Sequence, residues 1–163
     1  MRLPEREAGK MFPLPRGRRL GVDVGKVRVG VALSDPDGIL ATPLVTVARD
    51  MGAAPDAVPG DIAQLVRLVG EHEVVQIVVG LPVRLNGQEG AAAIDIRAYA
   101  GRLEHAVGGV PITLADERMS TVVATRRLAE RGVRGKRQRA VVDQAAAVEI
   151  LQSWLDAQRR QTR

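Results

Sequence analysis

Asp23 is the first residue whose type and place suggest chemistry. It lies inside the apolar run 20–24, where a carboxylate is costly to bury unless it is paired, hydrogen-bonded or bound to a metal. An Asp that bonds to backbone at the end of a strand is the structural alternative. Buried carboxylates without a neighbouring cation tend to mark functional sites, so Asp23 is a candidate site residue.

Asp143 is the second candidate, because it falls on the apolar stripe of a predicted C-terminal helix. At the 3.6-residue helical period, that stripe consists of Ala146, Ala147, Ile150, Leu151 and Trp154. An acid on a core-facing stripe needs a compensating partner or ligand. The alternative is an acid in the first helical turn, where the helix dipole favours negative charge.

Asp116 and Glu117 directly follow a predicted strand at 111–115. Loops at strand ends are where α/β proteins build their sites. One of these two carboxylates can face a site while the other binds Arg118 or caps the segment at Ser120. The spacing leaves this choice open.

Together, these positions predict a site for a hard metal ion. The chain has no Cys, which excludes thiolate zinc sites and thiol nucleophiles. Its two His residues leave little room for imidazole chemistry, and carboxylates alone favour Mg²⁺ or Mn²⁺. Two such ions, about 3.5–4 Å apart, hold the attacking water and the leaving oxygen of a phosphodiester. We therefore expect a two-metal site that hydrolyses phosphodiester bonds.

Positive charge is concentrated just before Asp143. The net charge of +5 and the pI near 10.6 by themselves favour a polyanionic partner only weakly. Between positions 126 and 139, however, seven basic residues stand against one acid. Because aromatic residues make up only 2% of the chain, we expect it to grip nucleic-acid backbone and shape without stacking on bases. In this basic segment, the candidate nucleic-acid-binding residues are Arg134, Lys136, Arg137 and Arg139. Arg118, shortly after the predicted strand at 111–115, is a further candidate.

The elements that must position these residues fit one α/β domain. With 163 residues, the chain is long enough for one core and too short for two substantial lobes. Apolar alternation predicts strands at 20–24, 28–33 and 39–47 in an antiparallel meander, and further strands at 73–79 and 111–115. Helices are expected at 61–72, with Asp61 as the cap, and after the 80–90 loop up to about residue 107. A third helix is expected from Ser120 or Thr121 to Gly132, and a fourth at 140–158 after a basic loop. Tandem strands followed by alternating helices and strands predict a mixed five-stranded sheet.

Both ends of the chain are predicted to lie outside this domain. Residues 1–18 form a basic lead-in that we expect to be disordered, residues 19–158 form the domain, and residues 159–163 form a basic tail. No apolar run is long enough to cross a membrane, and the lead-in lacks the apolar core of a signal peptide. We expect a cytoplasmic protein without a membrane partner.

Four local motifs occur in the order and approximate spacing of the YqgF/RuvX family. They are Leu-Gly-Val-Asp-Val-Gly at 20–25 with Arg-Val-Gly-Val-Ala at 28–32, Val-Gly-Leu-Pro at 79–82 with Asn-Gly at 86–87, Asp-Glu-Arg at 116–118 with Ser-Thr at 120–121, and Val-Val-Asp-Gln-Ala-Ala-Ala at 141–147. The resemblance runs from position 19 to about 156. It implies a ribonuclease H-like fold with helices on both faces of the sheet, related to the RuvC junction resolvases. It also implies that Asp23, Glu117 and Asp143 are the catalytic, metal-binding acids.

The first motif departs from the family pattern by one place. The family usually has a small residue and then Lys before the Arg, whereas this chain has Lys26 and Val27 before Arg28. On a strand, one place turns a side chain to the opposite face, so Arg28 is the better candidate for contact with nucleic acid. Val123 also stands where the family often has Glu, so no capping box forms with Ser120.

The family resembled has two attributed activities, processing of the 5′ end of precursor 16S ribosomal RNA and resolution of Holliday junctions. We rank the RNA first, because few aromatic residues and a basic segment suit structured RNA at least as well as DNA. A non-catalytic RNA-binding factor of ribosome assembly is one alternative. A nucleotide-binding module that uses 23–30 as a phosphate loop is another, although such proteins close two lobes over the nucleotide. Tight turns explain most glycines in that segment and in the 80–90 loop.

Overall fold

The computed structural model describes residues 14–84, 86–117 and 135–162. The predicted helix between positions 120 and 132 lies outside these ranges, as do Arg118 and Arg134. The strands are β1 (Arg19–Val24), β2 (Arg28–Ser34), β3 (Ala41–Ala48), β4 (Gln76–Leu81) and β5 (Ile112–Asp116). The described helices are α1 (Gly60–Glu71), α2 (Ala91–Val107) and α4 (Lys136–Gln161).

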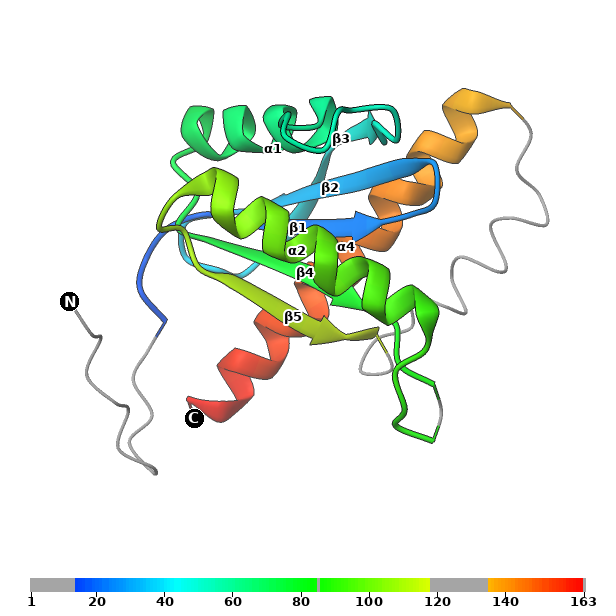
Figure 1. Ribbon diagram of the computed structural model, residues 1–163. Coiled ribbons are helices and arrows are strands. Elements are labelled where there is room, and N and C mark those ends of the chain that lie inside the picture. The colour runs from blue at the N-terminus through cyan, green and yellow to red at the C-terminus, as the bar shows by residue number, and fades with distance from the viewer. Residues whose placement is uncertain (1–13, 85, 118–134, 163) are drawn as a thin grey trace.

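The strands form one mixed sheet in the order β3-β2-β1-β4-β5 (Figure 1). The first three strands are an antiparallel meander, whereas β1, β4 and β5 run parallel to one another. This arrangement confirms the predicted five-stranded sheet. Because β1, β4 and β5 are parallel, their carboxyl ends meet at one edge, the place where open α/β sheets bind ligands.

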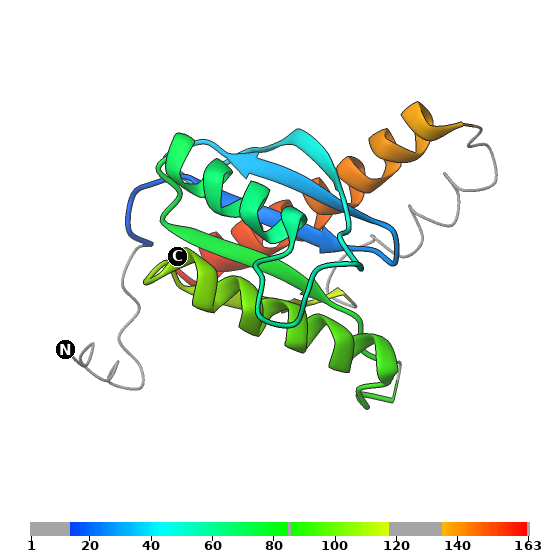
Figure 2. The same ribbon diagram turned by 45° about the horizontal axis from the view of Figure 1, so that its top comes forward.

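Helices cover both faces of the sheet, as expected. α1 and α2 lie together on one face, and α4 crosses the other face behind the central strands (Figure 2). Side chains alternate across each strand, so Val22 enters the core under α1 and α2 while Gly21 faces Leu151 of α4. Asp23 has the same parity as Gly21 and therefore belongs to the α4 face.

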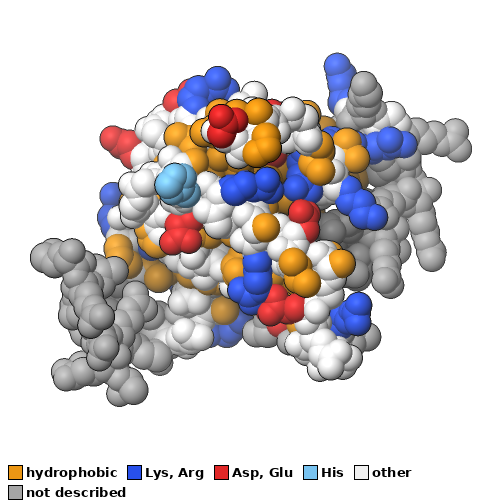
Figure 3. Space-filling view, in the orientation of Figure 1, with side chains coloured by type: hydrophobic (Ala, Val, Ile, Leu, Met, Phe, Trp, Pro, Cys, Tyr) orange, Lys and Arg blue, Asp and Glu red, His pale blue; other side chains and the backbone are white. Residues whose placement is uncertain are grey.

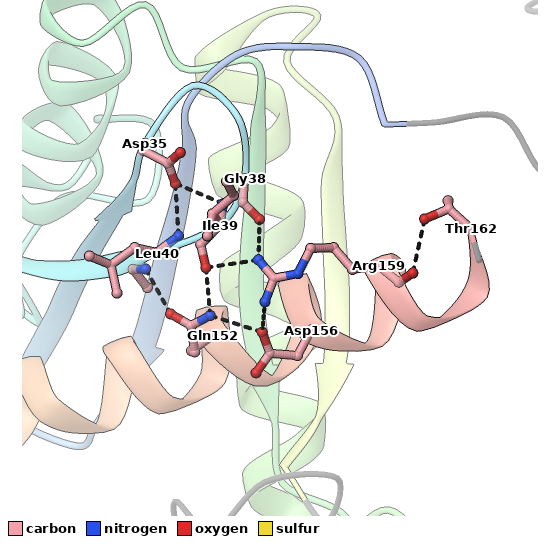
Figure 4. A network of polar contacts seen from close by, with 9 residues as sticks. Asp35, Gly38, Ile39, Leu40, Gln152, Asp156, Arg159 and Thr162 are labelled. Atoms are coloured by element: carbon pink, nitrogen blue, oxygen red, sulfur yellow. Dashed lines mark hydrogen bonds and ion pairs between the residues drawn. The ribbon is translucent and has the colours of Figure 1, made fainter.

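The C-terminal half of α4 is tied to the turn between β2 and β3 (Figure 4). The side chain of Gln152 accepts a hydrogen bond from Ala41 N–H at 2.8 Å and donates one to the carbonyl of Ile39 at 2.8 Å. Arg159 pairs with Asp156 and donates to the carbonyls of Gly38 and Ile39. These bonds set the position of α4 at the end of the sheet remote from Asp143.

Several boundaries differ from the predictions. α4 begins at Lys136, not at position 140, because Gly135 adopts a left-handed φ of 84° immediately before it. The apolar pattern could not reveal this start, since the first turn holds only charged and polar residues. β3 begins at Ala41, not 39, and β4 at Gln76, not 73. In both cases, apolar residues of the preceding turn extended the apparent strand.

The prediction that Asp61 caps α1 is wrong. The N-cap is Pro59, and Asp50 accepts the hydrogen bond from Gly60 N–H at 2.9 Å. Asp61 is buried instead and accepts a hydrogen bond from the Tyr99 hydroxyl at 2.9 Å. Burial, together with the charge of Asp61, raises the pKa of Tyr99.

Residues just before β1 are hydrogen-bonded to the domain. Arg19 is buried and donates hydrogen bonds to the carbonyls of Pro15 and Gly17, at 2.7 and 3.1 Å. The N–H of Gly17 in turn bonds to the carbonyl of Pro36. Burial lowers the pKa of Arg19. Across the described ranges, we find no helix with the length and apolar character needed to span a membrane.

Candidate functional site

A pocket of about 400 Å³ opens at the edge where the parallel strands end. It is bounded by the hairpin between β1 and β2, by the segments that follow β4 and β5, and by one side each of α2 and α4. Its lining residues are Asp23, Val24, Gly25, Lys26, Val27, Arg28, Pro82, Ala92, Ile96, Glu117 and Asp143.

All three acids expected from the family resemblance line this pocket. Asp23 is the penultimate residue of β1 and only 3% exposed, and Glu117 follows β5 and is 6% exposed. Asp143 reaches the pocket from α4. Asp116 and Glu117 both line a neighbouring pocket of about 230 Å³ beside Trp154, and of the two, Glu117 also lines the pocket that holds Asp23 and Asp143.

Two glycines allow α4 to approach the strands that carry this site. Gly30 pairs with Asp23 across β1 and β2, and a Cβ on Gly30 would overlap the backbone carbonyl of Asp143. A Cβ on Gly80 would lie 2.9 Å from Glu117 Oε1 and 2.5 Å from Ile150 Cδ1. Gly30 lies within β2, as expected for the predicted strand at 28–33, and Gly80 lies within β4 and not in the predicted 80–90 loop.

Asp143 is two turns inside α4, because the helix begins at Lys136. The alternative of an acid in the first turn is therefore wrong, and the helix dipole does not account for this residue. Its carboxylate is instead paired with Arg28, with 2.6 Å between Nε and Oδ2. The two side chains are 31% and 18% exposed, with Arg28 the more exposed of the two.

The donor set at this pocket suits a hard divalent cation, since three carboxylates line it together. Their present arrangement is not a finished metal site. Within the described part of the chain, no group of three acidic or histidine side chains stands in an arrangement that could hold a metal ion.

The sequence analysis missed Arg49, which follows β3 and holds the tip of the β1–β2 hairpin. Its backbone N–H bonds to the carbonyl of Val27 at 2.8 Å, and its guanidinium bonds to the carbonyl of Gly25 at 3.1 Å. The same guanidinium pairs with Asp95 at 3.2 Å and lies 5.3 Å from the centroid of the Tyr99 ring. An isolated Arg before a loop rich in Ala, Pro and Gly carries no sequence signal for this role.

Of the basic segment before Asp143, the residues from Lys136 onward belong to α4, and those from 126 to 134 lie outside the described residues. Arg137 and Arg139 are exposed in the first turn of α4, and basic side chains stand out on the surface around this end of the helix, at the upper right of Figure 3. The backbone of Lys136 begins the helix, while its side chain is outside the described set.

The chain matches the family described as "RuvX: Holliday junction resolvase" over residues 17–157. Three bacterial relatives are each named "Putative pre-16S rRNA nuclease". The protein from Rhodococcus erythropolis is 54% identical over 145 residues, which are 89% of this chain and 81% of the relative. The Nocardia farcinica protein is 55% identical over 86% of this chain and 78% of its own. For Mycolicibacterium paratuberculosis, the identity is 49% over 99% of this chain and 93% of the relative.

Among solved structures, RuvC of T. thermophilus in complex with a Holliday junction substrate has a similar fold. Its TM-score is 0.54 at 16% sequence identity, and the match covers 88% of this chain and 96% of that one. The likeness confirms the predicted ribonuclease H-like fold. With the family match, it also confirms the predicted class of enzyme, a nuclease. The matched residues include the whole sheet and the pocket-lining part of α4, and the chain therefore belongs to the RuvX family.

Proposed function

We propose that this protein is a metal-dependent endonuclease that processes the 5′ end of precursor 16S ribosomal RNA in the cytoplasm. The observation that carries the proposal is the meeting of Asp23, Glu117 and Asp143 at one pocket. Carboxylates brought together from three separate elements raise the cost of ionising one another. Arg28 offsets part of that cost at Asp143, and a bound divalent cation would offset it further.

Mg²⁺ or Mn²⁺ is the ion class that this donor set favours. Asp23 and Glu117 would hold it from the rigid sheet side, and Asp143 from the helix on the opposite wall. When bound, a pair of such ions supplies a nucleophilic water and stabilises the leaving oxygen. The buried position of Asp23 and Glu117 keeps both carboxylates oriented for this purpose.

Basic residues around the pocket would hold the phosphate backbone. Arg28 lines the pocket itself, and Arg137 and Arg139 lie in the first turn of α4. Cations are unfavourable at that end of a helix dipole, so their presence supports a polyanionic ligand there. Arg118, Arg134 and Lys136 belong to the same proposal.

The choice of RNA follows the names of the relatives and the low aromatic content of the chain, which suits a ligand held by its backbone. A Holliday junction is the second candidate substrate, favoured by the family description. An enzyme that cuts two symmetric strands is expected to act as a dimer.

A cleavage assay tests the proposal. The substrates are a labelled RNA with the 5′ end of precursor 16S ribosomal RNA and a labelled four-way DNA junction, each with Mg²⁺, Mn²⁺ or EDTA. We expect cleavage of the RNA with either metal and none with EDTA. Asp23→Asn and Asp143→Asn should each lower the rate by about 10²-fold or more, with RNA binding retained.

Asp37→Asn is the matched control, because Asp37 is an exposed acid that pairs with Arg16 in the β2–β3 turn. It should leave cleavage unchanged. Preferential cleavage of the junction would favour the resolvase. Tight, salt-sensitive RNA binding without cleavage of either substrate would instead identify an assembly factor and would contradict the proposed activity.

A further inference from the structure

Arg28 and Asp143 are both expected to serve the reaction, but in the structure they bind each other. Arg28 Nε donates to Asp143 Oδ2 at 2.6 Å, which is short for a charge-assisted hydrogen bond. Both residues line the pocket that also holds Asp23 and Glu117. The proposed metal ligand and the proposed phosphate ligand are therefore paired at the centre of the site.

A divalent ion and a guanidinium cannot share Asp143 without cost. Two positive groups separated by a few ångströms in a partly buried pocket repel one another strongly, because the effective dielectric constant there is well below that of water. An oxygen that accepts a short hydrogen bond from Arg28 is also less available as a metal ligand. Metal binding at Asp143 is therefore stronger when the Arg28 side chain has left Oδ2.

The backbone around Arg28 is held firmly, so the exchange involves the side chain alone. Arg28 pairs with Ala48 in the β2–β3 register, and its carbonyl accepts a hydrogen bond from Gly25 N–H at 2.8 Å. The carbonyl of Val27 is bonded to Arg49 N–H. The Arg28 side chain, in contrast, lines the pocket and is 31% exposed, so it already reaches solvent.

We infer that Arg28 is an internal cation that neutralises Asp143 in the metal-free protein, and that metal binding releases it to contact a substrate phosphate. This inference rests on the proposed function, since it takes Asp143 as a metal ligand. It makes metal and nucleic acid mutually dependent ligands. Each strengthens the binding of the other by the same factor, because both favour the state in which Arg28 has left Asp143.

Mn²⁺ titration of the full chain by calorimetry, without nucleic acid, tests the first half of the inference. Arg28→Gln removes the competing cation, and the Mn²⁺ dissociation constant should fall by about 10-fold, within the range typical of coupled sites. Arg28→Lys keeps the charge but loses the planar guanidinium. Its Mn²⁺ dissociation constant should lie between those of the unmodified protein and Arg28→Gln. A thermal unfolding curve for each variant establishes that it is folded.

Lys26→Gln is the matched control, because Lys26 is an exposed cation that lines the same pocket. It removes the same charge from the site but leaves the Arg28–Asp143 pair intact. Solvent screens its effect on the ion, so the Mn²⁺ dissociation constant should change by less than about 3-fold. An equal gain in Lys26→Gln and Arg28→Gln would overturn the inference by assigning the effect to general charge.

The second half concerns the phosphate contact and uses a phosphorothioate RNA that resists cleavage. With Mn²⁺ present, the salt dependence of RNA binding should be steeper in the unmodified protein than in Arg28→Gln by about one phosphate contact. With EDTA, the two slopes should coincide, because Arg28 is then held by Asp143. Coincident slopes under both conditions would overturn the phosphate role.

The outcomes separate this inference from the proposed function. Equal Mn²⁺ affinity in the unmodified protein and in Arg28→Gln, with affinity lost in Asp143→Asn, would overturn the competition but keep the metal site. Absence of Mn²⁺ binding in both the unmodified protein and Arg28→Gln would overturn the metal site itself, and the inference with it.

Discussion

The backbone of Asp143 rests directly against Gly30, the residue that pairs with Asp23 on the neighbouring strand. A single missing Cβ therefore brings an acid of α4 beside an acid of β1. Sheet and helix surfaces normally keep side chains between them, because close-packed interiors leave no voids. Here the contact is backbone to backbone, which allows carboxylates from both layers to share one pocket.

Gly30→Ala tests this close approach. The added methyl group would overlap the Asp143 carbonyl, so α4 must move away from β2. We expect a loss of about 1–3 kcal/mol in the free energy of unfolding. We also expect a lower cleavage rate under conditions in which the variant is still fully folded. Denaturant unfolding and single-turnover cleavage measure the two effects.

Gly101→Ala provides the control for Gly30→Ala. Gly101 lies in the middle of α2, and a Cβ there would meet nothing within 4 Å. Alanine should stabilise that helix by about 0.5–1 kcal/mol and leave cleavage unchanged. A Gly30→Ala protein with full stability and activity would show that α4 does not depend on this contact.

Arg49→Gln should disturb the site without touching the acids. Arg49 bonds to the carbonyl of Gly25 and is only 6% exposed at its side chain. Its replacement removes the hydrogen bond to the part-buried carbonyl of Gly25, which costs about 0.5–1.5 kcal/mol, and loosens the hairpin that carries Arg28. We expect a lower cleavage rate and a smaller change in RNA affinity. Arg67→Gln, which removes an exposed pair on α1, should change neither quantity.

Tyr99 is the single Tyr of the chain, so its ionisation can be followed directly by phenolate absorbance. An unperturbed phenol titrates near pH 10, whereas burial and the charge of Asp61 raise the pKa of Tyr99 in the folded protein. No phenolate should therefore appear at about pH 10–11 while the protein is folded. In denaturant, titration should return to about pH 10.

The same shift sets the sign of a pH effect on stability. Above about pH 10, the unfolded chain loses the Tyr99 proton and the folded chain keeps it, so the free energy of unfolding falls as pH rises. Below that pH, the stabilisation is fully present. Tyr99→Phe should remove the steepness of this alkaline loss. It should also destabilise the protein at neutral pH by about 1–3 kcal/mol, because Asp61 Oδ1 is already a buried atom without a hydrogen-bond partner.

Arg137 and Arg139 should contribute to nucleic-acid affinity through charge alone. Replacing each with Gln should weaken RNA binding and flatten the slope of log affinity against log salt by about one unit for each phosphate that the Arg neutralised. The fold should be unaffected, since both side chains are exposed. Arg16→Gln is the control, because Arg16 is an exposed Arg paired with Asp37 in the β2–β3 turn. An unchanged slope in the double variant would remove the start of α4 from the interface.

The sequence by itself determined the sheet and the family, and it marked Asp23 and Asp143 as candidate site acids. Strand alternation and apolar runs are local patterns, which are read from neighbouring residues alone. An acid that interrupts such a pattern, such as Asp23 in β1, can therefore be recognised without the tertiary structure. The position of Asp143 on the apolar stripe of the C-terminal helix could be recognised for the same reason, because the helical period is also a local pattern. Motif order then tied these acids to one family.

Only the tertiary structure decided how these residues meet. The pairing of Arg28 with Asp143, the support of Arg49 under the hairpin, and the meeting of Glu117 with Asp23 and Asp143 at one pocket all join residues distant in sequence. The sequence also does not distinguish a glycine in a turn from a glycine beneath a crossing helix. Gly30 is distinguished only by what lies above it, because steric exclusion between layers depends on distances in space that no local pattern encodes.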